Sequence, residues 1–321
     1  MTNDRPIIVI PGDDPPQCQG SPHLGRLAPY GEVRLYDNRP ADDAEKVERA
    51  KDATALINSR SVVKWPAGVL RRLPKLRMIT VCGIGTDSID LAEARARGIV
   101  VSNIPDKTPP LVAEHAFGLM FAVAKRAAFQ TAAMREGRWE KVDNVLLRGK
   151  TLGLVGTGNV GREMARLARA VGMNVLAWTF HPSPERARKL GVRYVGLDDL
   201  LGQSDVVSLH VRLTDESRHL IGRRELGLMK QGALFVNAAR GGVVDTDALV
   251  DALNSGHLGG AGLDVYEDEP LPKDHPLLRC EQVALTPHVA DMTPEGLELL
   301  NEGVVDNVIA FFEGHPRNVC T

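Results

Sequence analysis

The sequence lacks the closely spaced cysteines that mark a zinc site or a disulfide-bonded scaffold. Its four cysteines, Cys18, Cys82, Cys280 and Cys320, are far apart and form no CxxC or CxH pattern. A large charge of one sign is also missing, because the net charge is only −2. This balance argues against a nucleic-acid partner or a polybasic membrane surface. We therefore expect no bound metal and a reducing compartment, the cytoplasm.

Long apolar runs are absent as well. No apolar stretch reaches the length of about 18 residues that spans a membrane, so no membrane partner is expected. The apolar run at 7–10 is too short for the hydrophobic region of a signal peptide. Internal repeats and low-complexity tracts do not occur either. What remains is an ordinary soluble chain of 321 residues, 43% of them hydrophobic, which is long enough for two domains.

Strand-like and helix-like segments alternate in two series, which is typical of parallel α/β sheets. The first series has strands expected at 7–10, 33–36, 55–58, 78–81 and 100–103. The second has strands expected at 151–156, 174–179, 193–195, 206–210, 233–237, 260–265 and 283–287. The fold class predicted is therefore α/β with two doubly wound parallel sheets.

Two helices outside this alternation can be predicted in more detail. The apolar stretch 111–128 is expected to form one buried helix between the two series. The last helix is expected to begin at Thr293 as N-cap, with Pro294 at N1, and to stop at Gly314. Its apolar residues Leu297, Leu300, Val304 and Val308 share one face, so this helix should pack on a sheet.

The segment TLGLVGTGNVGREMARLARAVG contains the first chemical signal. It places Gly156, Gly158 and Gly161 in a GxGxxG pattern between a strand and a helix. In that setting the first glycine permits a tight turn, the second lets a pyrophosphate approach, and the third lets helix and strand pack closely. Asn159 and Val160 then open the helix whose N-terminus faces the phosphates. A glycine-rich turn without a ligand is the weaker alternative.

Cofactor choice is left open by the next strand. An acidic residue is expected at its end to bind the adenosine ribose, but Thr179 stands there. Without the carboxylate, discrimination against a 2'-phosphate weakens, and the nearby His181 and Arg186 could favour that phosphate. NAD is the cofactor predicted on general grounds, with NADP as an alternative.

Three polar residues follow strands of the second series. Arg240 comes after 233–237, Glu269 follows the strand in GLDVYEDEP, and His288 ends VALTPH. Ligands of open α/β sheets bind beyond the carboxyl ends of the strands, so these side chains could converge there. A glutamate bonded to an imidazole orients it for proton transfer, and an arginine beside it can hold a carboxylate or a 2-oxo oxygen. Taken singly, each could instead be a structural residue.

With these motifs in order, the sequence resembles the D-isomer-specific 2-hydroxyacid dehydrogenase family over almost its whole length. The likeness includes VCGIGTDSIDLAEARARGIVVSN, VAEHAFGLM, DVVSLHVRLTDESRHLIG, LMKQGALFVNAARGGVVDTDALVDAL, GAGLDVYEDEPLP and LTPHVA. It implies hydride transfer between a nicotinamide and C2 of a D-2-hydroxy or 2-oxo acid. His288 is then the acid/base, Glu269 tunes it, and Arg240 binds substrate, which His288 also contacts.

The resemblance also implies an architecture. Residues 1–103 and 293–321 would form a flavodoxin-like substrate-binding domain, and residues 104–292 a Rossmann domain inserted into it. Family members typically dimerise through the cofactor domain, so a homodimer is expected. In the substrate domain, Gly83, Ile84 and Gly85 of CGIGTD match the loop whose N–H groups hold the substrate carboxylate. Arg60 matches a loop near the entrance, although a solvated surface arginine is an alternative.

Further cofactor contacts are implied by the same likeness. His210 and Arg212 would lie near the adenosine, Ala238 near the nicotinamide ribose, and Asp264 near the carboxamide. His210 could equally be a structural histidine at a strand end. Arg212 stands where many members have proline, which again leaves NADP open, and Pro109 stands where many have threonine.

The particular acid is not fixed by these motifs. Glyoxylate, hydroxypyruvate, pyruvate-like acids and phosphohydroxypyruvate all remain possible, while the absence of a C-terminal regulatory domain disfavours long phosphoglycerate dehydrogenases. Phosphite dehydrogenases share the scaffold and are an alternative, whereas Glu269 disfavours the formate type. NAD(H)-binding corepressors also keep the three residues but have extra tails that this chain lacks.

Overall fold

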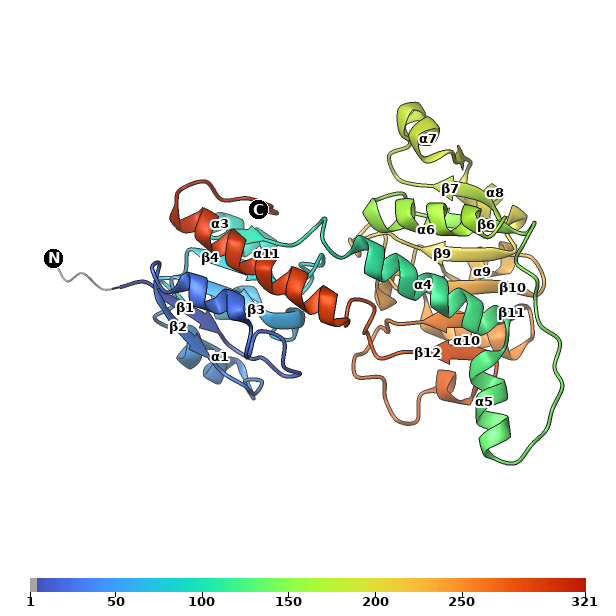
Figure 1. The fold of residues 1–321 in the computed structure, drawn as a ribbon, viewed down its shortest axis with the longest axis horizontal. Helices are drawn as coiled ribbons and strands as arrows, with labels where there is room; N and C mark the ends of the chain where they lie inside the picture. The colour runs from blue at the N-terminus through green and yellow to red at the C-terminus, as the bar shows by residue number, and fades with distance from the viewer. Residues whose placement is uncertain (1–4) are drawn as a thin grey trace. The chain divides into compact units, whose positions relative to one another are not determined.

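The computed structural model describes residues 5–321 and divides the chain into two compact units. One contains the chain up to Thr108 together with Met292–Thr321, and the other comprises Pro109–Asp291 (Figure 1). Each unit is built on a sheet whose strands all pair in parallel, which confirms the fold class predicted from the two alternating series. Within residues 5–321 no helix has the length and apolar character needed to cross a bilayer.

The smaller unit has five strands in the order β2-β1-β3-β4-β5. These are β1 (Ile7–Ile10), β2 (Glu32–Leu35), β3 (Ala55–Asn58), β4 (Met78–Val81) and β5 (Val100–Ser102), with helices α1 (Asp43–Ala50), α2 (Ala67–Leu70), α3 (Leu91–Ala96) and α11 (Pro294–Phe312). β3 and β4 are buried along their whole length, as expected for parallel strands covered on both faces. This strand order is that of the flavodoxin-like fold, in which the order reverses between β1 and β3.

The C-terminal helix α11 belongs to the smaller unit, and its predicted ends are confirmed. Thr293 accepts a bond from the Gly296 N–H at 3.0 Å, and Gly314 leaves the helix with φ of 83°. Its buried face carries Leu300, Val304 and Val308, whereas Leu297, which was predicted on the same face, stays partly exposed.

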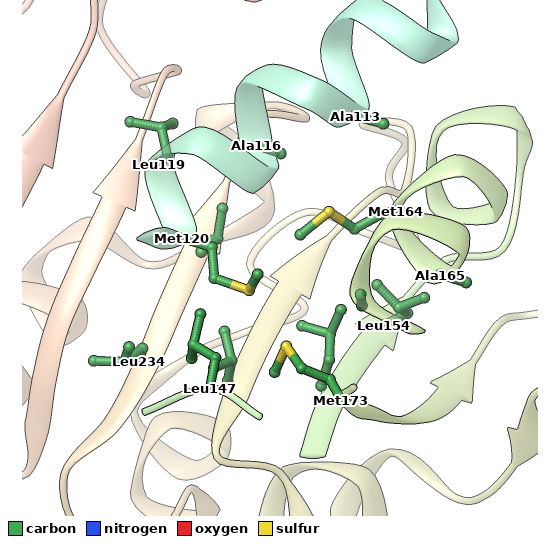
Figure 2. Close-up of a cluster of buried hydrophobic side chains, with 14 of the residues drawn as sticks. Ala113, Ala116, Leu119, Met120, Leu147, Leu154, Met164, Ala165, Met173 and Leu234 are labelled. Atoms are coloured by element: carbon green, nitrogen blue, oxygen red, sulfur yellow. The ribbon is translucent and has the colours of Figure 1, made fainter. Parts of the chain in front are cut away.

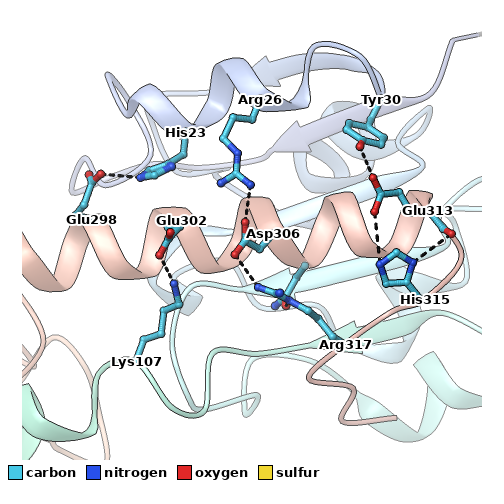
Figure 3. A network of polar contacts seen from close by, with 11 residues as sticks. His23, Arg26, Tyr30, Lys107, Glu298, Glu302, Asp306, Glu313, His315 and Arg317 are labelled. Atoms are coloured by element: carbon cyan, nitrogen blue, oxygen red, sulfur yellow. Dashed lines mark hydrogen bonds and ion pairs between the residues drawn. The ribbon is translucent and has the colours of Figure 1, made fainter.

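Polar side chains on the outer side of α11 fasten it to neighbouring segments of the same unit (Figure 3). Asp306 accepts bonds from Arg26 and Arg317, each at 2.7 Å, and Glu302 pairs with Lys107. Helix α11 is therefore held in the smaller unit both by apolar packing and by ion pairs.

The larger unit has seven strands in the order β12-β11-β10-β9-β6-β7-β8. The strands are β6 (Thr151–Val155), β7 (Asn174–Trp178), β8 (Arg193–Tyr194), β9 (Val206–Leu209), β10 (Ala233–Asn237), β11 (Leu258–Leu263) and β12 (Val283–Leu285). The helices are α4 (Pro109–Ala124), α5 (Ala127–Arg135), α6 (Asn159–Ala170), α7 (Pro184–Leu190), α8 (Leu197–Gln203), α9 (Arg223–Leu228) and α10 (Thr246–Asn254). This is the Rossmann order extended by one strand, and it reverses between β6 and β9.

The prediction of one helix over 111–128 is wrong, because two helices occupy this region. α4 ends at Ala124, and Arg126 adopts a left-handed conformation with φ of 53° before α5 begins. A single left-handed residue breaks the ladder of helical hydrogen bonds, and the apolar composition of the stretch carries no sign of it.

Helix α4 packs closely on the sheet of the larger unit (Figure 2). Met120 and Leu119 point toward the strands, and a Cβ atom at Gly262 of β11 would lie only 3.0 Å from the Leu119 Cβ. The glycines of β11 therefore allow α4 to lie close to the sheet. The carboxyl ends of strands in this sheet carry the candidate active site.

Candidate active site

The three residues predicted as a catalytic set follow three adjacent strands of the larger unit. Arg240 lies beyond β10, Glu269 beyond β11 and His288 beyond β12. These strands are neighbours in the sheet and run parallel, so their carboxyl ends lie at one edge. The topology therefore brings all three residues to the same edge of one unit.

His288 and Glu269 are bonded directly. The Nδ1 atom of His288 lies 2.7 Å from Glu269 Oε2, and Glu269 Oε1 accepts a bond from the Tyr266 N–H at 3.0 Å. A carboxylate facing Nδ1 favours the tautomer in which Nδ1 carries the proton, which leaves Nε2 as the atom that can exchange a proton with a ligand. The glutamate is held at both oxygens, so it fixes the plane of the imidazole ring.

The charge state of Glu269 follows from its surroundings. Burial raises the pKa of this carboxyl, but the bond from His288, the charge of that imidazole, the Tyr266 N–H and the charge of Arg240 together outweigh burial. The net effect lowers the pKa of Glu269 below its ordinary value. The residue is therefore a carboxylate at neutral pH and can stabilise a positive imidazolium.

The backbone of His288 is unusual. Its φ is 55°, in the left-handed region that residues other than glycine adopt uncommonly, although asparagine, aspartate and histidine do so more often than the rest. Such strain persists only where surrounding contacts impose it, and it is concentrated at functional sites.

Arg240 sits on a loop pressed against the loop that carries Glu269. Asn237 at the end of β10 bonds the loop through both amide atoms, to Ala239 N and Arg240 O, at 3.0 and 2.9 Å. A Cβ atom on Gly241 would collide with the backbone of Tyr266. A glycine follows the arginine because only the smallest residue lets the two loops touch.

A network beside His288 joins Asp264 to Thr286 and His115, two residues that sequence reasoning left without a role. Thr286 Oγ1 donates to Asp264 Oδ1 at 2.6 Å, and His115 Nε2 lies 2.9 Å from Thr286 Oγ1. Asp264 also accepts the N–H groups of Val289 and Ala290, at 2.9 and 3.0 Å. His115 lies in the VAEHAFGLM motif, and the family resemblance of this motif could have indicated a role for the histidine.

Asp264 thereby holds the loop on both sides of His288. The residue is fully buried, and although burial raises its pKa, the bonds from His115, Thr286 and Val289 lower the pKa overall. A buried carboxylate with four donors fixes backbone rigidly. The role implied by the resemblance, a contact with the nicotinamide carboxamide, stays a prediction.

The glycine-rich turn between β6 and α6 has the shape that a dinucleotide needs. Gly156 has φ of 102°, and a Cβ atom there would collide with the His210 carbonyl, while one on Gly161 would collide with the Gly156 carbonyl. In contrast, a Cβ atom on Gly158 would meet nothing within 4 Å. Two glycines are thus packed against protein, and the middle one faces open space at the N-terminus of α6, where Asn159 and Val160 lie. These residues fit a bound pyrophosphate.

A hollow of about 530 Å³ lies beside this turn, at the ends of β7 and β8. It is lined by Trp178, Thr179, Phe180, Pro182, Tyr194, Val195 and Gly196. Thr179 lines this hollow, and its place near the adenosine ribose stays a prediction. None of these lining residues is acidic, although Asp199 Oδ2 would lie 3.6 Å from a Cβ atom on Gly196.

His210 and Arg212 follow β9 on the other side of the turn. Burial lowers the pKa of His210 to about 4, so its imidazole is neutral near pH 7. His210 Nε2 lies 2.9 Å from Ser208 Oγ, and its Nδ1 is buried without a hydrogen-bond partner among residues 5–321. Arg212 is exposed and Ala238, after β10, is buried. The contacts with adenosine implied for His210 and Arg212 stay predictions.

The other residues predicted to bind substrate, besides Arg240 and His288, lie in the smaller unit. Arg60 follows β3 with φ of 48°, and Gly83, Ile84 and Gly85 follow β4. The Gly83 N–H donates to Val81 O at 3.0 Å, whereas no hydrogen bond among residues 5–321 uses the N–H groups of Ile84 and Gly85. Asn103 fixes the loop by donating to Ile84 O at 2.7 Å. Ile84 and Gly85 are therefore the better candidates for carboxylate donors.

Known proteins resemble the chain over nearly its whole length. The sequence model of the D-isomer specific 2-hydroxyacid dehydrogenase NAD binding domain matches residues 117–290. A glyoxylate reductase from Korarchaeum cryptofilum is 40% identical over 306 residues, which are 92% of this chain and 91% of that protein.

Two solved structures extend the comparison to the fold. A D-lactate dehydrogenase from Aquifex aeolicus, complexed with NAD and lactic acid, is 31% identical with a TM-score of 0.84, and the match covers 96% of both chains. An NADPH-dependent glyoxylate/hydroxypyruvate reductase from Sinorhizobium meliloti, in complex with NADP and malonate, is 31% identical with a TM-score of 0.85. That match covers 97% of this chain and 94% of the other.

Proposed function

The chain belongs to the D-isomer-specific 2-hydroxyacid dehydrogenase family and is a nicotinamide-dependent oxidoreductase of 2-hydroxy acids, and from this premise we propose that it reduces small 2-oxo acids with His288 as proton donor. The observation that supports this role is the 2.7 Å contact between His288 Nδ1 and Glu269. The contact leaves Nε2 of the imidazole available to a substrate oxygen.

In the proposed reaction His288, Glu269 and Arg240 have separate roles at C2 of the substrate. A bound nicotinamide supplies the hydride for reduction of the 2-oxo group. His288 Nε2 gives its proton to the C2 oxygen as negative charge develops there, and Glu269 stabilises the imidazolium before the proton leaves. Arg240 holds the substrate carboxylate or the 2-oxo oxygen through its paired N–H groups. In the opposite direction the same histidine takes the proton.

The experiment that tests this function is a spectrophotometric assay of NADH and NADPH oxidation against a panel of 2-oxo acids that begins with glyoxylate and hydroxypyruvate. Turnover with any of them supports the proposed reaction. Tight dinucleotide binding without turnover of any 2-oxo acid would favour a sensor or corepressor-like role instead. Reduction of NAD or NADP by phosphite, measured in a separate assay and without turnover of any 2-oxo acid, would assign the phosphite-type reaction. The four free thiols fit the cytoplasmic location that we propose.

For the cofactor we propose NAD, with NADP accepted as well. The hollow beside Thr179 contains no acidic lining residue, and relatives of both kinds exist: one solved structure contains NAD and another contains NADP. Since Thr179 carries no charge that would repel a 2'-phosphate, discrimination between the two cofactors should be weak.

Thr179→Asp is expected to shift the preference toward NADH by roughly tenfold or more, because a carboxylate accepts the ribose hydroxyl and repels a 2'-phosphate. The measurement is the ratio of kcat/KM values for NADH and NADPH. Thr179→Asn, which is similar in size and uncharged, is the control and should leave that ratio nearly unchanged. An unaltered ratio in the aspartate variant would show that the ribose binds elsewhere.

We propose that the protein is a homodimer. The end of α5 and the loop after it expose Met134, Trp139 and Leu146, with 57%, 79% and 68% of their surfaces accessible. Interfaces between copies are often marked by exposed apolar side chains of this size when they form one patch. A second copy of the chain would cover them.

Trp139→Ser combined with Leu146→Ser is expected to shift the protein from dimer to monomer at micromolar concentration, because the interface loses its apolar surface. Light scattering coupled to size-exclusion chromatography gives the molar mass. Leu278→Ser, at another exposed leucine with 50% accessibility, is the control and should remain dimeric. A wild-type protein that elutes as a monomer would exclude the proposed dimer.

A further inference from the structure

The glycine-rich turn after β6 carries a threonine between two of its glycines. Thr157 is only 5% exposed; it follows Gly156, which has φ of 102°, and precedes Gly158. Glycine permits many backbone conformations, so a turn that contains two of them is free to move unless other contacts hold it. Ordering a free segment during binding lowers the affinity for a ligand, whereas a turn that is already ordered avoids this loss. Contacts that hold Thr157 therefore affect how tightly the turn can bind a dinucleotide.

Hydrogen bonds join this turn to the neighbouring strands. The Gly156 N–H donates to the Trp178 carbonyl at the end of β7, at 2.8 Å. The hydroxyl oxygens of Thr157 and Tyr194 lie 2.7 Å apart, although Tyr194 ends β8 and is 37 residues away in the sequence. Because β7 lies between β6 and β8, the phenol ring of Tyr194 reaches past one strand to the turn. A long side chain with a polar tip is needed for this contact, since neighbouring strands are about 4.8 Å apart.

The side chain of Tyr194 is fixed along its length as well as at its tip. Its backbone pairs with Ala177 of β7, and its ring packs against the hydrophobic core of the larger unit. The residue also lines the hollow at the ends of β7 and β8, as Thr179 does. A ring packed against a core while its hydroxyl bonds Thr157 has few alternative rotamers. Tyr194 is therefore a rigid support for the turn.

We propose that Tyr194 is a positioning residue for the dinucleotide, which acts through Thr157 by keeping the glycine-rich turn ordered before the cofactor binds. This inference rests on the proposed binding of a dinucleotide at the turn and is independent of the reaction proposed for His288. The bond orders the free protein, so its loss should weaken cofactor binding and leave the hydride step unchanged. One net hydrogen bond corresponds to a factor of about three to ten in an equilibrium constant, which sets the size of the expected effect.

The test measures the Kd of NADH by fluorescence titration in the absence of a 2-oxo acid. Tyr194→Phe keeps the ring and removes the hydroxyl, so this Kd should rise by about three- to tenfold. The value of kcat at saturating NADH should stay within about twofold of wild type. Thr157→Val should raise the Kd by a similar factor, and Thr157→Ser, which keeps a hydroxyl, should restore it. Tyr30→Phe is the matched control, since it removes a phenol that donates to Glu313 at 2.6 Å in the smaller unit, and it should leave the Kd unchanged.

A double variant and a smaller ligand distinguish positioning from a purely structural role. Tyr194→Phe combined with Thr157→Val should raise the Kd no further than either change alone, because both remove the same bond. ADP-ribose, which has the pyrophosphate but no nicotinamide, should lose affinity for Tyr194→Phe by the same factor as NADH. Additive losses in the double variant, a loss confined to NADH, or an unchanged Kd in Tyr194→Phe, whether or not its Tm falls, would each overturn the inference. Failure of turnover with 2-oxo acids contradicts only the proposed function.

Discussion

His288→Ala is expected to lower kcat by about 10²- to 10⁴-fold, the range that a positioned general acid contributes. The substrate oxygen would lose its proton donor, while the glycine-rich turn at Gly156 and Gly158 is separate from this side chain. Dinucleotide affinity should therefore stay within about threefold of wild type, because the variant removes only the proton-transfer step. The measurements are steady-state kcat with the best 2-oxo acid and the Kd of NADH from fluorescence titration.

A second histidine in the same unit provides a matched control. His219 is paired with Glu267 at 2.6 Å and has φ of 50°, close to the 55° of His288. His219→Ala therefore also removes a histidine-glutamate pair at a residue with a left-handed backbone, but it should leave kcat nearly unchanged. Loss of NADH binding in His288→Ala, or equal losses of kcat in both variants, would count against proton transfer by His288.

Much of the fold could be predicted because its determinants are local. The alternating strand and helix signals predicted the two parallel sheets. The N-cap at Thr293 and the stop at Gly314 could be predicted because each depends only on neighbouring residues in the sequence. The break at Arg126 could not be predicted, since its left-handed conformation is imposed by packing rather than by a glycine or proline. Apolar composition alone does not show where a helix turns.

The site shows the same division between local and distant determinants. The strand ends that carry Arg240, Glu269 and His288 could be predicted, because parallel topology places such ends along one edge. The network of His115, Asp264 and Thr286 could not, because it joins a helix at the start of the larger unit to two strand ends near its finish. The close approach of Gly241 to Tyr266 also depends on three-dimensional structure. Local patterns thus locate the reactive groups, and tertiary contacts decide how rigidly they are held.

Arg240→Met is expected to lower kcat/KM for the 2-oxo acid by about 10²- to 10³-fold, because a group that stabilises developing negative charge is lost. Arg240→Lys should recover only a small part of that loss. The guanidinium donates through Nη1 to the Ala239 carbonyl at 2.7 Å. This planar group can therefore bind the loop and a substrate oxygen at the same time. An ammonium group is a single point donor and cannot match that geometry.

Saturation kinetics with hydroxypyruvate at fixed NADH would measure this loss, and KM for NADH should change little in either variant. Arg223→Met serves as the control, since Arg223 lies on the exposed surface of the same unit and pairs with Asp251 at 2.7 Å. Full activity in Arg240→Lys would mean that positive charge alone is sufficient at this position. In that case Arg240 would act through its charge on Glu269 and the substrate, and the two-point contact proposed for its guanidinium would be wrong.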